Sequence, residues 1–176
     1  MKNRFQRTLK RLSHQLLPAK VLKHQIALRN WRRGEPEIRV LKALVPPGRG
    51  AIDVGAYLGA YTYFLTRLSP VVHAFEPQPE CFQFLSKAYA APVMIHQCAL
   101  SNQVGKIGMT HANDVIPNQG ASLVSGEKSA TRHFDDLTNV LEVDVQKLDN
   151  FALANIGFIK IDAEGEIGRA SCRERV

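Results

Sequence analysis

The sequence lacks what a disulfide framework, a metal centre or a membrane span would need. Its three cysteines, Cys81, Cys98 and Cys172, are odd in number and form no CxxC pair, so we expect no disulfides and a reducing compartment. No histidine lies at zinc-ligand spacing from a cysteine or another histidine, so no metal site is expected. No stretch approaches the roughly 20 apolar residues of a transmembrane helix, and the N-terminus does not resemble a secretory signal. These absences predict a cytoplasmic protein.

Acidic side chains are absent from the first 34 residues, which hold ten of the 23 Lys and Arg. The rest of the chain holds 13 basic and 16 acidic side chains, so a mildly acidic domain follows a basic arm. Apolar spacing predicts helices over residues 4–17 and 19–31, separated by Pro18. The packing candidates of the second helix are Val21, Leu22, Ile26 and Trp31.

Two interpretations of this arm (residues 1–34) stay open. It is either a helix pair that packs on the domain and leaves its charges in water, or a segment that binds an anionic partner. That partner would be a membrane surface or nucleic acid. The second interpretation adds peripheral membrane contact to the expected cytoplasmic location.

Short apolar runs alternate with amphipathic segments in the middle of the chain. Strands and helices are predicted, in alternation, at 51–54, 62–69, 71–75, 79–90 and 93–97. Strands that alternate with helices of this length indicate a parallel α/β sheet with right-handed crossovers. Further along, period-two patterns at 104–110 and 140–148 predict a hairpin or added strands, with a polar loop between them at 112–136.

A glycine turn follows the first predicted strand, and an acid ends the second. Gly55 and Gly59 allow a ligand to approach the backbone closely, and the next helix offers free amide groups at its N-terminus. Glu76, 21 residues after Gly55, is placed to accept hydrogen bonds from both hydroxyls of a ribose. Asp53 suits the ammonium group of a cofactor, or a water that holds it. The pattern D-x-G-x-x-x-G therefore favours an adenosylmethionine site.

Other functions fit the pattern less well. A dinucleotide fingerprint has glycine where Tyr57 stands, which disfavours a nicotinamide-dependent oxidoreductase. A phosphate-binding P-loop is excluded because no GK[ST] follows the turn. A non-enzymatic module on a degenerate Rossmann core, binding membranes or nucleic acid, is the remaining alternative.

Five segments in this order resemble the FkbM family of S-adenosylmethionine-dependent methyltransferases: AIDVGAYLGAYT, AFEPQPECFQFL, CALSNQVGKIGM, QKLDNF and GFIKIDAEG. The resemblance runs from about Ile38 to Gly165. It implies an α/β, Rossmann-like class I methyltransferase with a parallel sheet and flanking helices. It also implies an O-methyltransferase that uses S-adenosylmethionine on a hydroxyl of a small-molecule or glycan acceptor. The D-A-E-G after the last strand differs from the [DNS]-P-P-[YFW] of enzymes that methylate nucleic-acid amino groups, so no nucleic acid is expected as a partner.

The resemblance also assigns roles to individual residues. Residues that match the family's cofactor-binding segments are Asp53, Gly55, Gly59, Glu76, Ala99 and Ser101. Asp162 and Glu164 match the acidic pair that faces the transferred methyl group, where a base would take the proton of the hydroxyl nucleophile. An alternative for this pair is structural, with Asp162 as a helix N-cap and Glu164 in its first turn.

The sequence departs from the family pattern at two places. The family commonly has Asn where Tyr57 stands. Near the C-terminus, Glu166 comes one position earlier than the glutamate of the family pattern, and the segment that follows it, IGRASCRERV, does not resemble the family. We therefore expect three parts, a basic arm at 1–34, a methyltransferase domain at 35–166 and a non-family tail at 167–176. On this interpretation the sheet is incomplete after the strand at 156–161. An uncovered apolar edge there predicts poor solubility or inactivity.

Overall fold

The computed structural model describes residues 18–110, 123–124 and 140–162. Its elements, in chain order, are α2 (Ala19–Arg33), η1 (Pro36–Val40), α3 (Leu41–Leu44), β1 (Gly50–Val54), α4 (Ala60–Leu65), β2 (Val72–Phe75), α5 (Pro79–Ala88), β3 (Val93–His96), β4 (Ala99–Leu100), β5 (Gly105–Thr110), β6 (Leu123–Val124), β7 (Val140–Gln146), η2 (Leu148–Phe151) and β8 (Ile156–Ile161). The helix predicted at 4–17, Glu164 and the tail at 167–176 lie outside the described residues.

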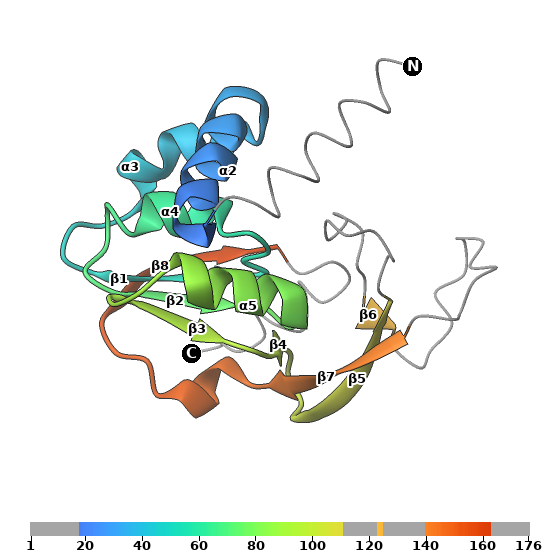
Figure 1. Ribbon diagram of the computed structural model, residues 1–176. Helices are drawn as coiled ribbons and strands as arrows, with labels where there is room; N and C mark the ends of the chain where they lie inside the picture. The colour runs from blue at the N-terminus through green and yellow to red at the C-terminus, as the bar shows by residue number, and fades with distance from the viewer. Residues whose placement is uncertain (1–17, 111–122, 125–139, 163–176) are drawn as a thin grey trace, which may run out of the picture.

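Four strands form a parallel sheet in the order β3-β2-β1-β8 (Figure 1). Strands β1 and β2 are buried along their whole length, because they lie between other strands and both faces of the sheet are covered at their positions. This arrangement explains why their sequences are mostly apolar, with Asp53 and His73 as the polar exceptions. The sheet and its flanking helices confirm the predicted α/β, Rossmann-like fold.

Helices α4 and α5 connect the first three strands and cover one face of the sheet. The core on this side joins the sheet to α3 and α4 through Leu41, Tyr61, Leu65 and Val72. Helix α4 begins and ends earlier than the predicted 62–69, and α5 ends two residues before the predicted 90. Both helices nevertheless occupy the predicted places between strands, which sets the ends of β1 and β2 side by side.

Helix α2 packs on α4 and α5, on their side away from the sheet (Figure 1). It confirms the second predicted helix, and Leu22 and Ile26 are buried as predicted. The expectation that Val21 also packs inward was wrong, because its side chain lies on the opposite, exposed face of the helix. Trp31 contacts the domain as expected, since its ring lies against Phe64 of α4, but it is 41% exposed. Of the helices in the described ranges, none has the length and apolarity needed to cross a membrane.

A second sheet has the strand order β4-β7-β5-β6 and extends from the carboxyl end of β3 (Figure 1). Strands β5 and β7 pair antiparallel from Gly105↔Val145 to Thr110↔Val140, which confirms the predicted hairpin or added strands. Of the predicted loop at 112–136, the structure describes only Leu123–Val124, which pair with β5 as β6.

Candidate functional site

The turn between β1 and α4 has three residues in the left-handed region. They are Gly55, Tyr57 and Gly59, with φ values of 72°, 51° and 77°. The amides of Gly55 and Ala56 both donate to the carbonyl oxygen of Phe75 at 3.0 Å, which ties the turn to the end of β2. The turn is therefore a fixed structure at the carboxyl end of the sheet.

Gly59 is required by its conformation and by its contact with α5. A Cβ at this position would lie 2.8 Å from Cδ2 of Leu85 and 2.9 Å from the Tyr89 ring. The Tyr89 hydroxyl also donates to the Gly59 carbonyl at 2.8 Å. The close approach at Gly59 is thus to the protein's own helix, a reason that the glycine spacing alone did not reveal.

Tyr57 has a positive φ, which is uncommon for a residue with a bulky side chain. Asn adopts this region more readily, which gives a physical reason for the Asn that the family commonly has there. The Tyr57 ring packs against Ile26, Leu58 and Cys81, and burial raises the pKa of its hydroxyl to about 12.

Glu76 connects the end of β2 to this turn. Its two carboxylate oxygens accept hydrogen bonds from the backbone amides of Tyr57, at 2.7 Å, and Gln78, at 2.9 Å. The residue is only 3% exposed, and burial raises the pKa of its carboxyl to about 7 despite these two bonds. One amide on each oxygen leaves each a further lone pair, so the structure is compatible with the predicted ribose contact.

Asp53 lies beneath the turn and is fully buried. The Thr62 hydroxyl donates to its Oδ2 at 2.7 Å, and Nζ of Lys160 lies 3.4 Å from its Oδ1. The structure thus places Asp53 in a supporting position, held by two groups of the protein. Its contact with a cofactor ammonium stays a prediction.

Lys160 is a residue of the site that sequence reasoning missed. It pairs with Asp53 in the register of β1 and β8, and its Nζ donates to the carbonyl oxygens of Gly55 (3.2 Å) and Val54 (3.5 Å). The same ammonium lies 3.5 Å from Oδ2 of Asp162. A single lysine in the otherwise apolar run IGFIKI was the available signal, since a charge in such a strand needs a partner.

Asp162 directly follows β8 and lies beside the turn. Its amide donates to the Val54 carbonyl at 3.0 Å, and its side chain is 56% exposed. The structure therefore brings together the predicted residues Asp53, Gly55, Glu76 and Asp162. Glu164 lies outside the described residues, so the pairing of the two acids and the helix-cap alternative both stay predictions.

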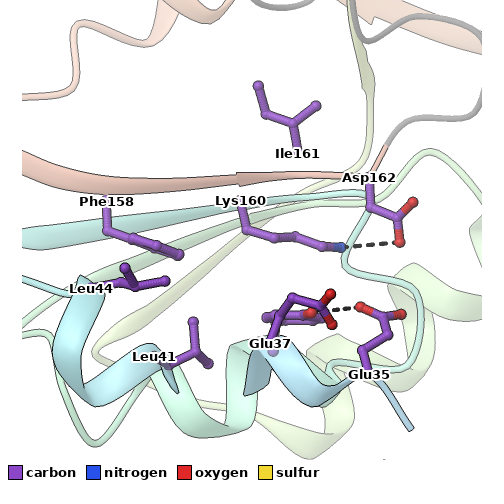
Figure 2. A pocket seen from close by; sticks show the side chains of 9 residues that line it. Glu35, Glu37, Leu41, Leu44, Phe158, Lys160, Ile161 and Asp162 are labelled. Carbon is purple, nitrogen blue, oxygen red and sulfur yellow. Dashed lines mark hydrogen bonds and ion pairs between the residues drawn. The ribbon is translucent and has the colours of Figure 1, made fainter. Parts of the chain in front are cut away.

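An open cavity of about 410 Å³ borders Asp162 (Figure 2). Its lining residues are Glu35, Glu37, Leu41, Leu44, Tyr61, Phe158, Lys160, Ile161 and Asp162. In Figure 2, Lys160 extends toward Asp162 at one end, and Leu44 and Phe158 form an apolar wall at the other. The Tyr61 hydroxyl donates to Oε2 of Glu35 at 2.5 Å, and burial together with this bond raises the pKa of Tyr61. The cavity thus has a polar end at the carboxyl end of β8.

Two of the predicted cofactor-binding residues, Ala99 and Ser101, lie at the second sheet. Ala99, on β4, packs with Met109, Val143 and Val145 in the core of that sheet. The amide of Ser101 donates to the Gln146 carbonyl at 3.0 Å. The two residues follow β3 as expected, and their contact with a cofactor stays a prediction.

The parallel sheet, with its glycine turn after β1 and its acid after β2, defines a Rossmann-like α/β protein. A family model described as "Methyltransferase FkbM domain" matches residues 53–166, more than half of the chain. The chain therefore belongs to the FkbM methyltransferase family, which confirms the family predicted from its five motifs.

A solved structure and the curated proteins complete the comparison. The chain is similar to the crystal structure of methyltransferase FkbM from Methylobacillus flagellatus KT, with 17% sequence identity and a TM-score of 0.45. The similarity covers 86% of this chain, which spans 39% of the length of the solved one. No curated protein matches the chain.

Proposed function

We propose that the protein transfers a methyl group from S-adenosylmethionine to a hydroxyl oxygen of a small-molecule or glycan acceptor. The observation that carries this proposal is that the residues after three adjacent parallel strands lie close together at one edge of the sheet. The glycine turn follows β1, Glu76 follows β2 and Asp162 follows β8, and hydrogen bonds of Tyr57 and Asp162 join them. Membership of the FkbM family supports the same reaction.

The residues at the end of β2 fit a ribose. Glu76 keeps one lone pair on each oxygen for a hydroxyl, as described above. Beside it, Oε1 of Gln78 is buried without a hydrogen-bond partner among the described residues. A buried acceptor of this kind is costly unless a donor reaches it, and a ribose hydroxyl or an amino group is such a donor. We therefore assign the nucleoside part of S-adenosylmethionine to Glu76 and Gln78.

The chemistry requires alignment and the removal of one proton. When bound, S-adenosylmethionine supplies a methyl group on a positively charged sulfur, which is open to attack by a nucleophile. An acceptor hydroxyl is a weak nucleophile at neutral pH, so a carboxylate that accepts its proton assists the transfer. Asp162 is exposed beside the cavity, and Lys160 and the Val54 carbonyl fix its position next to the turn. We assign Asp162 as this base, with the sequence-predicted Glu164 as its partner.

The acceptor is assigned to the cavity beside Asp162. Its apolar wall, from Leu41, Leu44 and Phe158, suits the carbon face of a ring. At the polar end, the carboxylates of Glu35, Glu37 and Asp162 are hydrogen-bond acceptors. Acceptors of this kind pair with hydroxyl donors, which favours a polyhydroxylated acceptor such as a sugar.

Calorimetric titration of the full chain with S-adenosylmethionine tests the cofactor, with a nicotinamide dinucleotide as control. We expect S-adenosylmethionine alone to bind, and Glu76→Gln to weaken binding about tenfold or more, because two charge-assisted hydrogen bonds to the ribose are lost. Glu142→Gln, on the exposed surface of β7, is the matched control and should leave binding unchanged. Binding of the dinucleotide alone would overturn the proposal.

The acceptor is tested by incubation with labelled S-adenosylmethionine and a panel of sugars, phenols and amines, followed by mass spectrometry of the products. We expect the label on a hydroxyl oxygen. Transfer to nitrogen alone would contradict the proposed acceptor class while leaving the cofactor assignment intact.

A further inference from the structure

Helix α2 has two apolar stripes, of which one is buried against the domain and the other is largely exposed. Leu22, Ile26 and Ala27 are buried on the side that faces α4 and α5. A second stripe consists of Val21, Leu28 and Trp31, whose exposed fractions are 44%, 49% and 41%. Its spacings of seven and three residues place these side chains on one face of the helix. A helix that only covered α4 and α5 would need the first stripe alone.

The charges on α2 are all of one sign. Residues 18–34 contain five Lys and Arg and no Asp or Glu. One of these cations, Lys23, faces inward, where its Nζ donates to the Ala88 carbonyl at 2.7 Å and lies 4.6 Å from the centroid of the Tyr89 ring. The other basic side chains are exposed, namely Lys20, Arg29, Arg32 and Arg33. The second stripe is therefore bordered by positive charge.

The exposed face is preformed, because α2 is fixed at several points. Lys23 holds the helix to α5, and the Arg39 guanidinium donates to the carbonyl oxygens of Trp31, at 3.1 and 3.2 Å, and of Arg32, at 3.4 Å. The ring of Trp31 lies against Phe64, with 5.6 Å between the ring centroids. A partner that binds this face does not have to order the helix first, which lowers the entropic cost of binding.

We propose that α2 docks on an anionic membrane surface and lies in the plane of the interface. The docking face is defined by Val21, Leu28, Trp31, Lys20, Arg29 and Arg32. Apolar side chains, one of them tryptophan, beside Lys and Arg are the combination that interfacial helices use on anionic lipids. A nucleic acid would be contacted by the cations and would leave Val21 and Leu28 in water. The inference concerns a surface outside the cavity and does not depend on the proposed reaction.

Trp31 is the only tryptophan of the chain, so its fluorescence reports directly on this face. The experiment titrates the full chain with vesicles of equimolar phosphatidylcholine and phosphatidylserine, and with phosphatidylcholine vesicles as the uncharged control. We expect a blue shift of Trp31 emission and co-sedimentation with the anionic vesicles, both weakened by added salt. The combined variant Val21→Ser and Leu28→Ser should weaken vesicle binding about tenfold or more, because two apolar anchors are lost.

Controls separate the docking face from the rest of the chain. Neither Val21 nor Leu28 is in the buried stripe, so circular dichroism should show an unchanged fold. Met94→Ser, at a 54% exposed position on β3, is the matched control and should bind vesicles like the unchanged chain. Neutralising Lys20, Arg29 and Arg32 with glutamine should also reduce binding.

Three outcomes would overturn the proposal. The first is an absence of binding to anionic vesicles. The second is binding without a blue shift of Trp31 emission, or without sensitivity to the Val21 and Leu28 substitutions, which would place the contact elsewhere, such as the basic residues before Pro18. The third is binding to duplex nucleic acid but not to vesicles, which would assign the basic face to a different class of partner.

Discussion

The two sides of the candidate site differ in how their carboxylates are held. On the side of the glycine turn, Asp53 and Glu76 are buried, and each of their four oxygens contacts an amide, a hydroxyl or an ammonium group of the protein. On the side of β8, Asp162 is exposed beside the cavity, with Lys160 at 3.5 Å. Lys160 joins the two sides, because its ammonium group contacts both Asp53 and Asp162.

Because of this difference, we expect the buried carboxylates to matter for stability and the exposed carboxylate to matter for the reaction. A buried carboxylate held by donors of the protein has a fixed position before any ligand arrives, and its removal disturbs the fold. An exposed carboxylate beside a cavity is accessible to an acceptor and contributes little to stability. We therefore expect substitutions on the turn side to change the free energy of unfolding, and substitutions at Asp162 to change the rate.

The largest expected effect is on turnover. Asp162→Asn should lower turnover about 100-fold or more, because it removes the carboxylate that we propose as the acceptor of the hydroxyl proton. The affinity for S-adenosylmethionine and the stability should change little, since Asp162 is exposed and its amide still donates to Val54. Single-turnover kinetics with a labelled methyl group, together with calorimetry, measures both quantities. Unchanged turnover would remove the catalytic role of Asp162.

The next largest effect is on stability, at the residue that joins the two sides. Lys160→Met should lower the free energy of unfolding by about 3 kcal/mol, because Asp53 remains buried without its cation. Urea unfolding measures this change. The double variant with Asp53→Asn should recover part of the loss, since no uncompensated charge is left.

A matched control for this ion pair lies on the second sheet. Lys106 and Glu142 form an ion pair at 2.8 Å in which both side chains are mostly exposed. Lys106→Met should leave stability almost unchanged, because solvent screens the pair. Equal losses for Lys106→Met and Lys160→Met would contradict the proposed contrast between buried and exposed charge.

The contribution of Glu76, on the turn side, to the free energy of unfolding depends on pH. Its pKa is raised by burial from 4.5 to about 7, so the folded chain binds more protons at this site than the unfolded chain between these values. Its contribution to stability is therefore fully present below pH 4.5 and is lost as the pH rises to about 7. At about 1.4 kcal/mol per pKa unit, the loss is at most about 3 kcal/mol.

The measurement compares the unfolding free energies of the unchanged chain and Glu76→Gln across this pH range. The comparison with Glu76→Gln is needed because other groups also make the stability depend on pH. Burial lowers the pKa values of His73 and His96, and these shifts make the free energy of unfolding rise with pH, opposite to the effect of Glu76. A difference that does not vary with pH would show that Glu76 is not held with a raised pKa.

The sequence predicted the local parts of this architecture and missed those that depend on distant pairing. Buried central strands and the helices between them have strong local patterns, so β1, β2 and the glycine turn were predicted closely. The role of Lys160 depends on the register of β8 against β1, two strands that lie far apart in the sequence. Nothing in the residues around Lys160 specifies that its partner is Asp53.

Helix α2 shows a different limit of sequence patterns. Because the helix has apolar residues on two faces, its periodicity does not specify which face packs inward. Leu22 and Ile26 were predicted correctly, whereas Val21 was predicted to pack and is exposed, and Trp31 packs on Phe64 with only part of its surface. The inward face is decided by the surface of α4 and α5, which only the folded chain provides.

The smallest expected effect tests the rigidity of the turn side. Gly59→Ala should lower the free energy of unfolding by about 2 kcal/mol, because Ala is strained at a φ of +77° and its Cβ would lie 2.8 Å from Leu85. Gly105→Ala, where a Cβ meets no atom within 4 Å, is the matched control and should have no destabilising effect. Since Gly59 is the N-cap of α4, its substitution should also shift the turn and weaken S-adenosylmethionine binding, whereas Gly105→Ala should not. Equal stability and equal affinity for the two variants would show that the turn tolerates movement. The turn side would then be no more rigid than the exposed side at Asp162.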